Sequence, residues 1–218
     1  MRIFTAYDKI FGTKASLAPA PVNLQRRNLD ARLDISREHL RLRVGYQGRR
    51  NLGFGAGIAG VLNFNRYSED RTNADLTYHN PKLIKNWDVT ANASFLNTQS
   101  RLPKGSWILP PGAFGGSYPK GVLESSTIFE HHTRLNLSGF YSGFKQHTLR
   151  LGIGYYYGDL YKSTEQTNIG INPATGLPIP PDSDAVDLTD TPYIAMPEKA
   201  RNNLGIHTQL GIDNRNSL

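Results

Sequence analysis

The chain has 218 residues, of which 38% are hydrophobic, with a formal net charge of +7 and no cysteine. It contains no continuous apolar stretch that suits a membrane-spanning helix, and it can form neither disulfides nor thiolate metal sites. A transmembrane β-barrel remains compatible with this composition, because only every second strand residue faces lipid. Nucleic-acid binding is not predicted, because Lys and Arg are spread along the whole chain without a helix-periodic stripe.

In chain order, residues 1–23 show no strong periodicity and no apolar signal-peptide core, so they are expected to be a lead-in to the first strand. Seven stretches then alternate apolar and polar residues, as half-buried strands do. In the second stretch, for example, Leu40 and Leu42 alternate with Arg41 and Arg43. The predicted strands, all free of proline, are 28–36, 40–47, 67–79, 87–97, 132–141, 148–158 and 203–212.

The connections between these strands alternate between short and long. The short turns are predicted at 36–39, 80–86 and 142–147, and the long loops at 48–66, 98–131 and 159–202. Strict alternation of this kind is typical of transmembrane β-barrels, which have short periplasmic turns and long extracellular loops. We therefore expect an all-β, antiparallel up-and-down segment of about seven strands from an incomplete transmembrane barrel.

The polar side of each predicted strand carries many charges. If residues 36–39 form the first turn, Asp34 faces Arg41 and Arg32 faces Arg43. The second pairing is unfavourable unless a third group intervenes, such as an acidic plug surface or an anionic ligand. A self-satisfied lattice of polar groups lining the barrel interior is favoured over direct ligand binding. The predicted interior charges are Arg32, Arg41, Arg43, Arg71, Arg134, Arg150, Asp30, Asp34, Asp75 and Asp88.

Aromatic residues fall near strand ends on the apolar side, where membrane-interface girdles are found in barrels. Ordinary aromatic enrichment in sheets is the alternative explanation. The predicted girdle residues are Tyr46, Tyr78, Trp87, Tyr141, Tyr155 and Tyr157.

Motifs for catalysis or metal binding are weak. The run Gly55–Gly60 matches G-x-G-x-x-G, but it neither follows a predicted strand directly nor opens a helix, so a loop is favoured. His131 and His132 lack a third ligand at suitable spacing, and adjacent strand residues point to opposite faces. The acidic stretch around Asp182–Asp190 does not have EF-hand spacing, and a solvated loop is favoured over a calcium site. No enzyme activity, cofactor or metal is predicted.

Several of these segments are similar to barrel strands of TonB-dependent outer-membrane receptors. The resemblance lies in LRLRVGYQGR at 40–49, RYSEDRTNADLTYHN at 66–80, HTRLNLSG at 132–139 and LRLGIGYYYGD at 149–159, and it extends over roughly residues 20 to 201. It also includes the loop that ends DTPY at 190–193 and continues MPEK at 196–199.

This resemblance implies a barrel of about 22 strands whose lumen is closed by a plug. Such a receptor sits in the outer membrane, contacts its lipid, and imports ferric siderophores, cobalamin or similar ligands with energy passed through the TonB complex. Residues 1–218 show no TonB box, no plug domain and no terminal aromatic residue, so the chain is expected to be a middle piece of such a receptor.

An iron chelate would meet the extracellular loops, and arginine or aromatic positions there are the candidate contacts. These are Arg49, Arg50, Phe54, Arg66, Trp107, Phe114 and Tyr118. Two alternatives remain open: an outer-membrane channel without a plug, in which loops gate and interior charges set selectivity, and a soluble all-β binding module. As an isolated chain in water, the expected fragment is non-functional and aggregates through its unpaired edges and apolar face.

Overall fold

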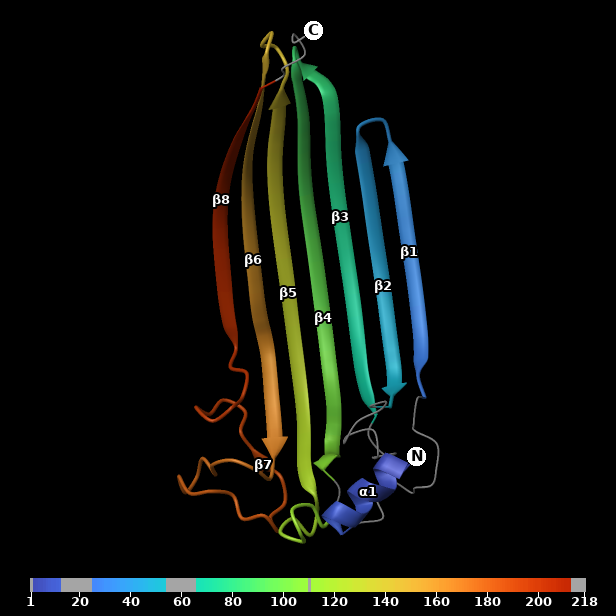
Figure 1. Ribbon diagram of the computed structural model, residues 1–218, viewed down its shortest axis with the longest axis vertical. Helices are drawn as coiled ribbons and strands as arrows, with labels where there is room; N and C mark the ends of the chain where they lie inside the picture. The colour runs from blue at the N-terminus through green and yellow to red at the C-terminus, as the bar shows by residue number, and fades with distance from the viewer. Residues whose placement is uncertain (1, 13–24, 54–65, 110, 213–218) are drawn as a thin grey trace.

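The computed structural model describes residues 2–12, 25–53, 66–109 and 111–212, which form one helix and one antiparallel sheet (Figure 1). Helix α1 spans Arg2–Phe11, within a segment for which the sequence predicted no regular element. The strands are β1 (Arg27–Arg37), β2 (Leu40–Leu52), β3 (Tyr67–Ile84), β4 (Trp87–Leu109), β5 (Val122–Tyr141), β6 (His147–Thr167), β7 (Val186–Asp187) and β8 (Lys199–Ile212). The all-β prediction is confirmed.

The strands follow one another through the sheet in chain order from β1 to β6, and every pairing is antiparallel. The two-residue β7 and the longer β8 share the far edge of β6, with β7 at the loop end and β8 along the rest. Within the described chain β1 pairs only with β2, and β8 only with β6, so the sheet stays open. The predicted up-and-down segment of an incomplete barrel is therefore confirmed as an open sheet.

The register keeps the apolar and polar sides in phase from strand to strand. Residues directly opposite each other in an antiparallel pair share a face, so a row of partners can be followed across the whole sheet. One apolar row is Leu42, Leu76, Ala93, Leu135, Tyr155 and Leu204. The next row, on the opposite face, is Asp34, Arg43, Asp75, Ser94, Arg134, Tyr156 and Asn203.

The apolar face is not covered by any described element. Leu137, near its centre, is 50% exposed, and Ile206 on β8 is 79% exposed. Figure 1 shows the long strands as a single layer, with the connections gathered at the two ends. A sheet normally buries one apolar face against another layer, so this face requires an apolar environment from outside the described chain.

The strands run further than the sequence predicted, and the long loops are correspondingly shorter. The predicted loop at 98–131 was wrong over most of its length, because β4 continues to Leu109 and β5 begins at Val122. The loop predicted at 159–202 likewise loses residues to the ends of β6 and β8, which leaves 168–198 with the short β7 inside it, and the loop predicted at 48–66 loses residues to β2, which continues to Leu52. These extensions carry polar residues on both sides, so they lack the period-two signal that identified the rest.

Two of the short turns are also tighter than predicted, whereas the third spans 142–146, close to the predicted 142–147. The β1–β2 turn consists of Glu38 and His39 alone, with Glu38 at φ 51°, instead of 36–39. The β3–β4 turn consists of Lys85 and Asn86, with Asn86 at φ 63°, instead of 80–86. Two-residue hairpins use left-handed backbone of this kind, which is uncommon for residues other than glycine.

The expectation that every proline lies outside the strands was wrong at two positions. Pro81 lies in β3 and Pro103 in β4. Both fall where the register shifts, between Asn80 and Ile84 in β3 and between Leu102 and Ser106 in β4. Proline has no N–H to give to the ladder, so it is tolerated where a bulge interrupts the pairing.

The buried core of the described chain lies at the loop end, not in the middle of the sheet. Its buried hydrophobic residues are Ala113, Val122, Ile179 and Leu188, which come from the connections 111–121 and 168–198 and from the start of β5. In Figure 1 helix α1 lies at this same end of the strands, opposite the short turns. The two long connections are thus folded structures that pack on the strand ends.

Candidate functional site

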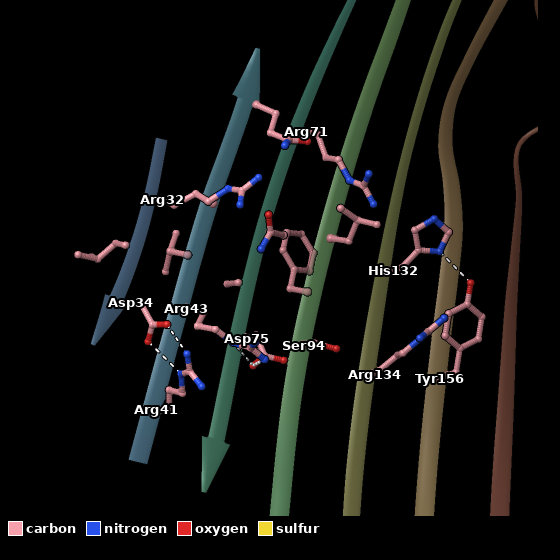
Figure 2. A pocket seen from close by; sticks show the side chains of 18 residues that line it. Arg32, Asp34, Arg41, Arg43, Arg71, Asp75, Ser94, His132, Arg134 and Tyr156 are labelled. Carbon is pink, nitrogen blue, oxygen red and sulfur yellow. Dashed lines mark hydrogen bonds and ion pairs between the residues drawn. The ribbon is translucent and has the colours of Figure 1, made fainter. Parts of the chain in front are cut away.

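The polar face of the sheet holds a hollow of about 940 Å³ spanning β1 to β6 (Figure 2). Its charged lining consists of Arg32, Arg41, Arg43, Arg71 and Arg134 together with Asp34 and Asp75. All seven are predicted interior charges, and the sheet brings them onto one surface. Alternation along the strands places them there, because their positions share the polar face in every pairing.

Two ion pairs neutralise part of this charge. Arg41 donates through Nε and Nη2 to the Asp34 carboxylate, at 3.0 and 2.5 Å. Arg43 donates through Nη2 to Oδ1 of Asp75 at 2.7 Å. Asn92 donates to the other oxygen of Asp75 at 2.8 Å, so this carboxylate is bonded on both sides. Here the structure resembles the predicted self-satisfied lattice.

The pairing of these residues across the hairpin differs from the prediction. The tighter turn moves the register by two residues, so Asp34 lies opposite Arg43 and Arg32 lies opposite Gly45. Arg41 reaches Asp34 diagonally, and the expected clash of Arg32 with Arg43 does not occur. Because a shift of two residues leaves every side chain on its face, the faces were right although the partners were wrong.

Among the described residues, the remaining arginines of the hollow form no ion pair with a carboxylate. Arg32 and Arg71 are two of them, and in Figure 2 both extend over the hollow. The guanidinium of Arg134 lies 5.4 Å from the ring centroid of Tyr156, whose hydroxyl is 2.8 Å from Nδ1 of His132. The hollow therefore keeps a positive excess, with cations held against aromatic and polar groups.

The other predicted interior charges lie outside this hollow. Nε2 of His79 lies 2.7 Å from Oδ1 of Asp88 near the short turns. Arg150 lines a smaller hollow with Asp88 and Gln209. Asp30 shares the polar face and lies opposite Gln47.

The predicted girdle residues all lie on the apolar face by register, but at different heights. Trp87 and Tyr141 pair at the turn end of β4 and β5, with ring centroids 5.1 Å apart. Tyr46 and Tyr157 lie towards the loop end, in the middle of strands that continue beyond them. Tyr78 and Tyr155 lie between these levels, among aliphatic side chains.

The candidate ligand contacts do not form one cluster. Contrary to the expectation of loop positions, Arg49 and Arg50 belong to β2 and Trp107 to β4. Arg66 directly precedes β3 and donates to Gln25 at 3.1 Å. Phe114 and Tyr118 lie in the connection 111–121 with ring centroids 5.7 Å apart. Phe54, like the Gly55–Gly60 motif, lies outside the described residues.

A buried asparagine at the loop end was not singled out from the sequence. Asn168 is fully buried, accepts a hydrogen bond from the backbone N–H of Leu123 at 2.7 Å and donates to the carbonyl of Gly121 at 2.8 Å. An ion pair links the same two long connections, with Nζ of Lys120 2.7 Å from Oδ1 of Asp184. No local pattern marks such a residue, because its role arises from the meeting of segments that lie far apart in the chain.

Two carboxyl groups of the loop end have shifted pKa values. Burial, with the neighbouring Glu165 carboxylate, raises the pKa of Glu124. Hydrogen bonds from Thr189 lower the pKa of Asp187 below its ordinary value. Asp187 thus accepts hydrogen bonds and Asp184 forms an ion pair with Lys120, and no group of three or more His, Asp or Glu residues in the described chain is arranged to hold a metal ion.

Within the described residues, no helix has the length and apolar character needed to cross a membrane. Comparison of the chain with protein-family models, with curated proteins and with solved structures finds no match.

Proposed function

We propose that this chain forms part of the wall of an outer-membrane β-barrel that transports a solute, of the TonB-dependent receptor type. The observation that carries the proposal is the pairing of an uncovered apolar face with an arginine-rich polar face in one antiparallel sheet. A barrel wall needs this combination, because one side meets lipid and the other an aqueous or protein-filled interior.

The height of the apolar surface supports a bilayer as its environment. We define the apolar band as the part of this face between the level of Trp87 and Tyr141 and the level of Phe95 and Tyr157. From Trp87 to Phe95 the strand advances by roughly 26 Å, at about 3.3 Å per residue. Transmembrane β-strands need about 9 to 11 residues to cross, so this segment is long enough.

A soluble binding module is the less favoured alternative. In a soluble sandwich a second layer would cover the apolar face, whereas in the described chain large side chains such as Leu137 and Ile206 remain uncovered. The outer edges of β1 and β8 are also unpaired among the described residues. In the proposed barrel, further strands pair with both edges and close the wall.

The polar hollow suits an anionic occupant of the barrel interior. Five arginines against two aspartates leave a positive excess, centred on Arg32 and Arg71. An acidic plug surface or a passing iron chelate would complement this charge. In a channel without a plug, which is the second candidate, the same arginines would favour anion permeation. Single-channel recording of the complete barrel that contains this chain, in planar bilayers, separates the two, because only a barrel without a plug gives an anion-selective conductance without added partners.

The wall itself is tested by cysteine scanning, which is simplified because the natural chain has no cysteine. Single cysteines are introduced at Leu135, Asn136, Leu137 and Ser138 in the band of β5, and at Thr127 beyond it. With the chain in phosphatidylcholine vesicles, we expect a membrane-impermeant maleimide to label Asn136→Cys, Ser138→Cys and Thr127→Cys, and to spare the two leucine positions. Equal labelling of all five cysteine variants in the presence of vesicles would refute the barrel-wall proposal.

A further inference from the structure

Beyond the apolar band, the lipid side of the sheet carries a cluster of cations and aromatic rings. We call it the loop-side belt and define it by Arg50, Asp70, Arg101, Phe129 and Lys162. These residues lie on the same face as the band, since Asp70 pairs with Gln99, Gln99 with Phe129 and Phe129 with Lys162. None of them was among the predicted girdle or interior residues.

Two cations share a single ring in this belt. The guanidinium carbon of Arg101 lies 4.6 Å from the ring centroid of Phe129, and Nζ of Lys162 lies 5.4 Å from the same centroid. Like charges gathered on one ring repel each other, so the arrangement favours an anion between or beside them.

The belt holds too little negative charge for its cations. Asp70 is bonded by Arg50 at 2.6 Å, by Arg101 at 3.1 Å and by the Tyr46 hydroxyl at 2.7 Å. One carboxylate therefore serves two arginines. Among the described residues Lys162 has no carboxylate partner, and its side chain is exposed.

A second hollow, of about 550 Å³, adjoins the belt on its far side from the band. Arg101 lines it together with Arg66 and Lys104, and several hydroxyl groups complete the lining. These hydroxyls belong to Ser68, Ser125, Ser126, Thr127, Thr164 and Thr189, and Asp187 is also part of the wall. Hydroxyl and basic groups in this combination suit a phosphate group.

The height of the belt places it beside lipid headgroups. Phe129 lies four residues beyond Thr133, which is level with Phe95 and Tyr157 at the edge of the band. Four residues correspond to roughly 13 Å along the strand, or about 9 Å along the membrane normal for a strand tilted by about 45°. The headgroup layer of a bilayer extends about 5 to 8 Å beyond the hydrocarbon, within reach of an extended lysine.

We propose that the loop-side belt binds the phosphate of an anionic lipid in the membrane leaflet on the loop side, with Lys162 and Arg101 as its main contacts. This inference rests on the proposed function, because it needs the apolar band to lie in a bilayer. The free phosphate ion is the alternative source of the same chemistry, and lipid is favoured because the belt directly continues the lipid-facing surface.

The test compares binding of the full-length chain to vesicles of phosphatidylcholine alone and of phosphatidylcholine mixed with phosphatidic acid, followed by co-sedimentation. The belt variant combines R101Q with K162Q. Its control combines R32Q with R71Q, which removes the same charge from the opposite face. We expect phosphatidic acid to strengthen binding of the natural chain and of the control, and the belt variant to lose about fivefold of this gain for each cation removed.

Three outcomes overturn the inference in distinguishable ways. If the belt variant and the control variant lost vesicle binding equally, net charge alone would explain the effect, and the belt would not be a binding site. Loss of the phosphatidic-acid preference on adding inorganic phosphate at constant ionic strength would assign the site to the free ion. If the chain bound neutral vesicles and phosphatidic acid did not strengthen that binding, the belt proposal would be refuted and the barrel-wall proposal would remain supported. No binding to any vesicle would refute both proposals.

Discussion

The substitution Leu137→Arg tests the bilayer environment of the apolar band at its centre. Leu137 lies four residues from Tyr141 at the turn-side rim and four from Thr133 at the loop-side rim. The strand therefore carries it roughly 13 Å from either rim, at about 3.3 Å per residue. A cation at this depth has the longest path to water in either direction.

The expected cost follows from this depth. An arginine on the lipid face of a barrel destabilises it by about 2–4 kcal/mol at the bilayer midplane and by about 0–1 kcal/mol near the interface. Leu137→Arg should therefore reduce the folding equilibrium constant in vesicles roughly 30- to 1,000-fold, and Thr133→Arg less than about tenfold. Asn136→Arg is the matched control, because the adjacent side chain faces the polar side.

The assay is urea titration of vesicle-bound chain, followed by tryptophan fluorescence. If the sheet instead stays in water as the described residues leave it, Leu137 is half exposed, and its replacement should change stability by only about 0.5 kcal/mol. Equal midpoints for Leu137→Arg and Asn136→Arg in vesicles would refute the reasoning that assigns the band to lipid.

Three further predictions concern the loop end and the turn-side rim. Asn168→Ala leaves the part-buried N–H of Leu123 and the buried carbonyl of Gly121 without their side-chain partner. The cost is about 1–3 kcal/mol for each buried group left unpaired, so hydrogen exchange should accelerate in both long connections and not in the band. The folded pKa of Glu124 is raised, so its contribution to stability is fully present below its ordinary pKa of 4.5 and is lost as pH rises through the folded pKa. Glu124→Gln should abolish this decline in a pH series of melting curves, and an unchanged series would contradict the reasoning. A Cβ at Gly139 would lie 2.8 Å from the Trp87 ring, so Gly139→Ala should cost about 1–3 kcal/mol in the urea titration, whereas Gly205→Ala, with only a carbonyl oxygen at 4.0 Å, serves as control.

Which residues lie opposite each other across the first hairpin could not be predicted from the sequence. The alternation around Asp34 and Arg41 identifies their common face, but a turn of two residues and a turn of four preserve the same faces. Backbone at Glu38 decided between them, since its positive φ closes the tighter turn and moves Arg43 opposite Asp34. The ion pair of Arg41 with Asp34 was thus predicted correctly, through a diagonal contact that the prediction did not contain.

The sequence by itself determined the all-β fold class, the order of the long strands and the two faces of the sheet. It could do so because side chains alternate with a period of two, so an apolar residue every second position marks a face without knowledge of any partner. Tertiary structure alone decided the register, the extension of β4 and β5 past the apolar band, the burial of Asn168 and the meeting of Arg101 with Lys162 over Phe129. The turn at Glu38 sets the register of the first hairpin, and the other features depend on contacts between residues far apart in the chain, which alternation along a single strand does not show.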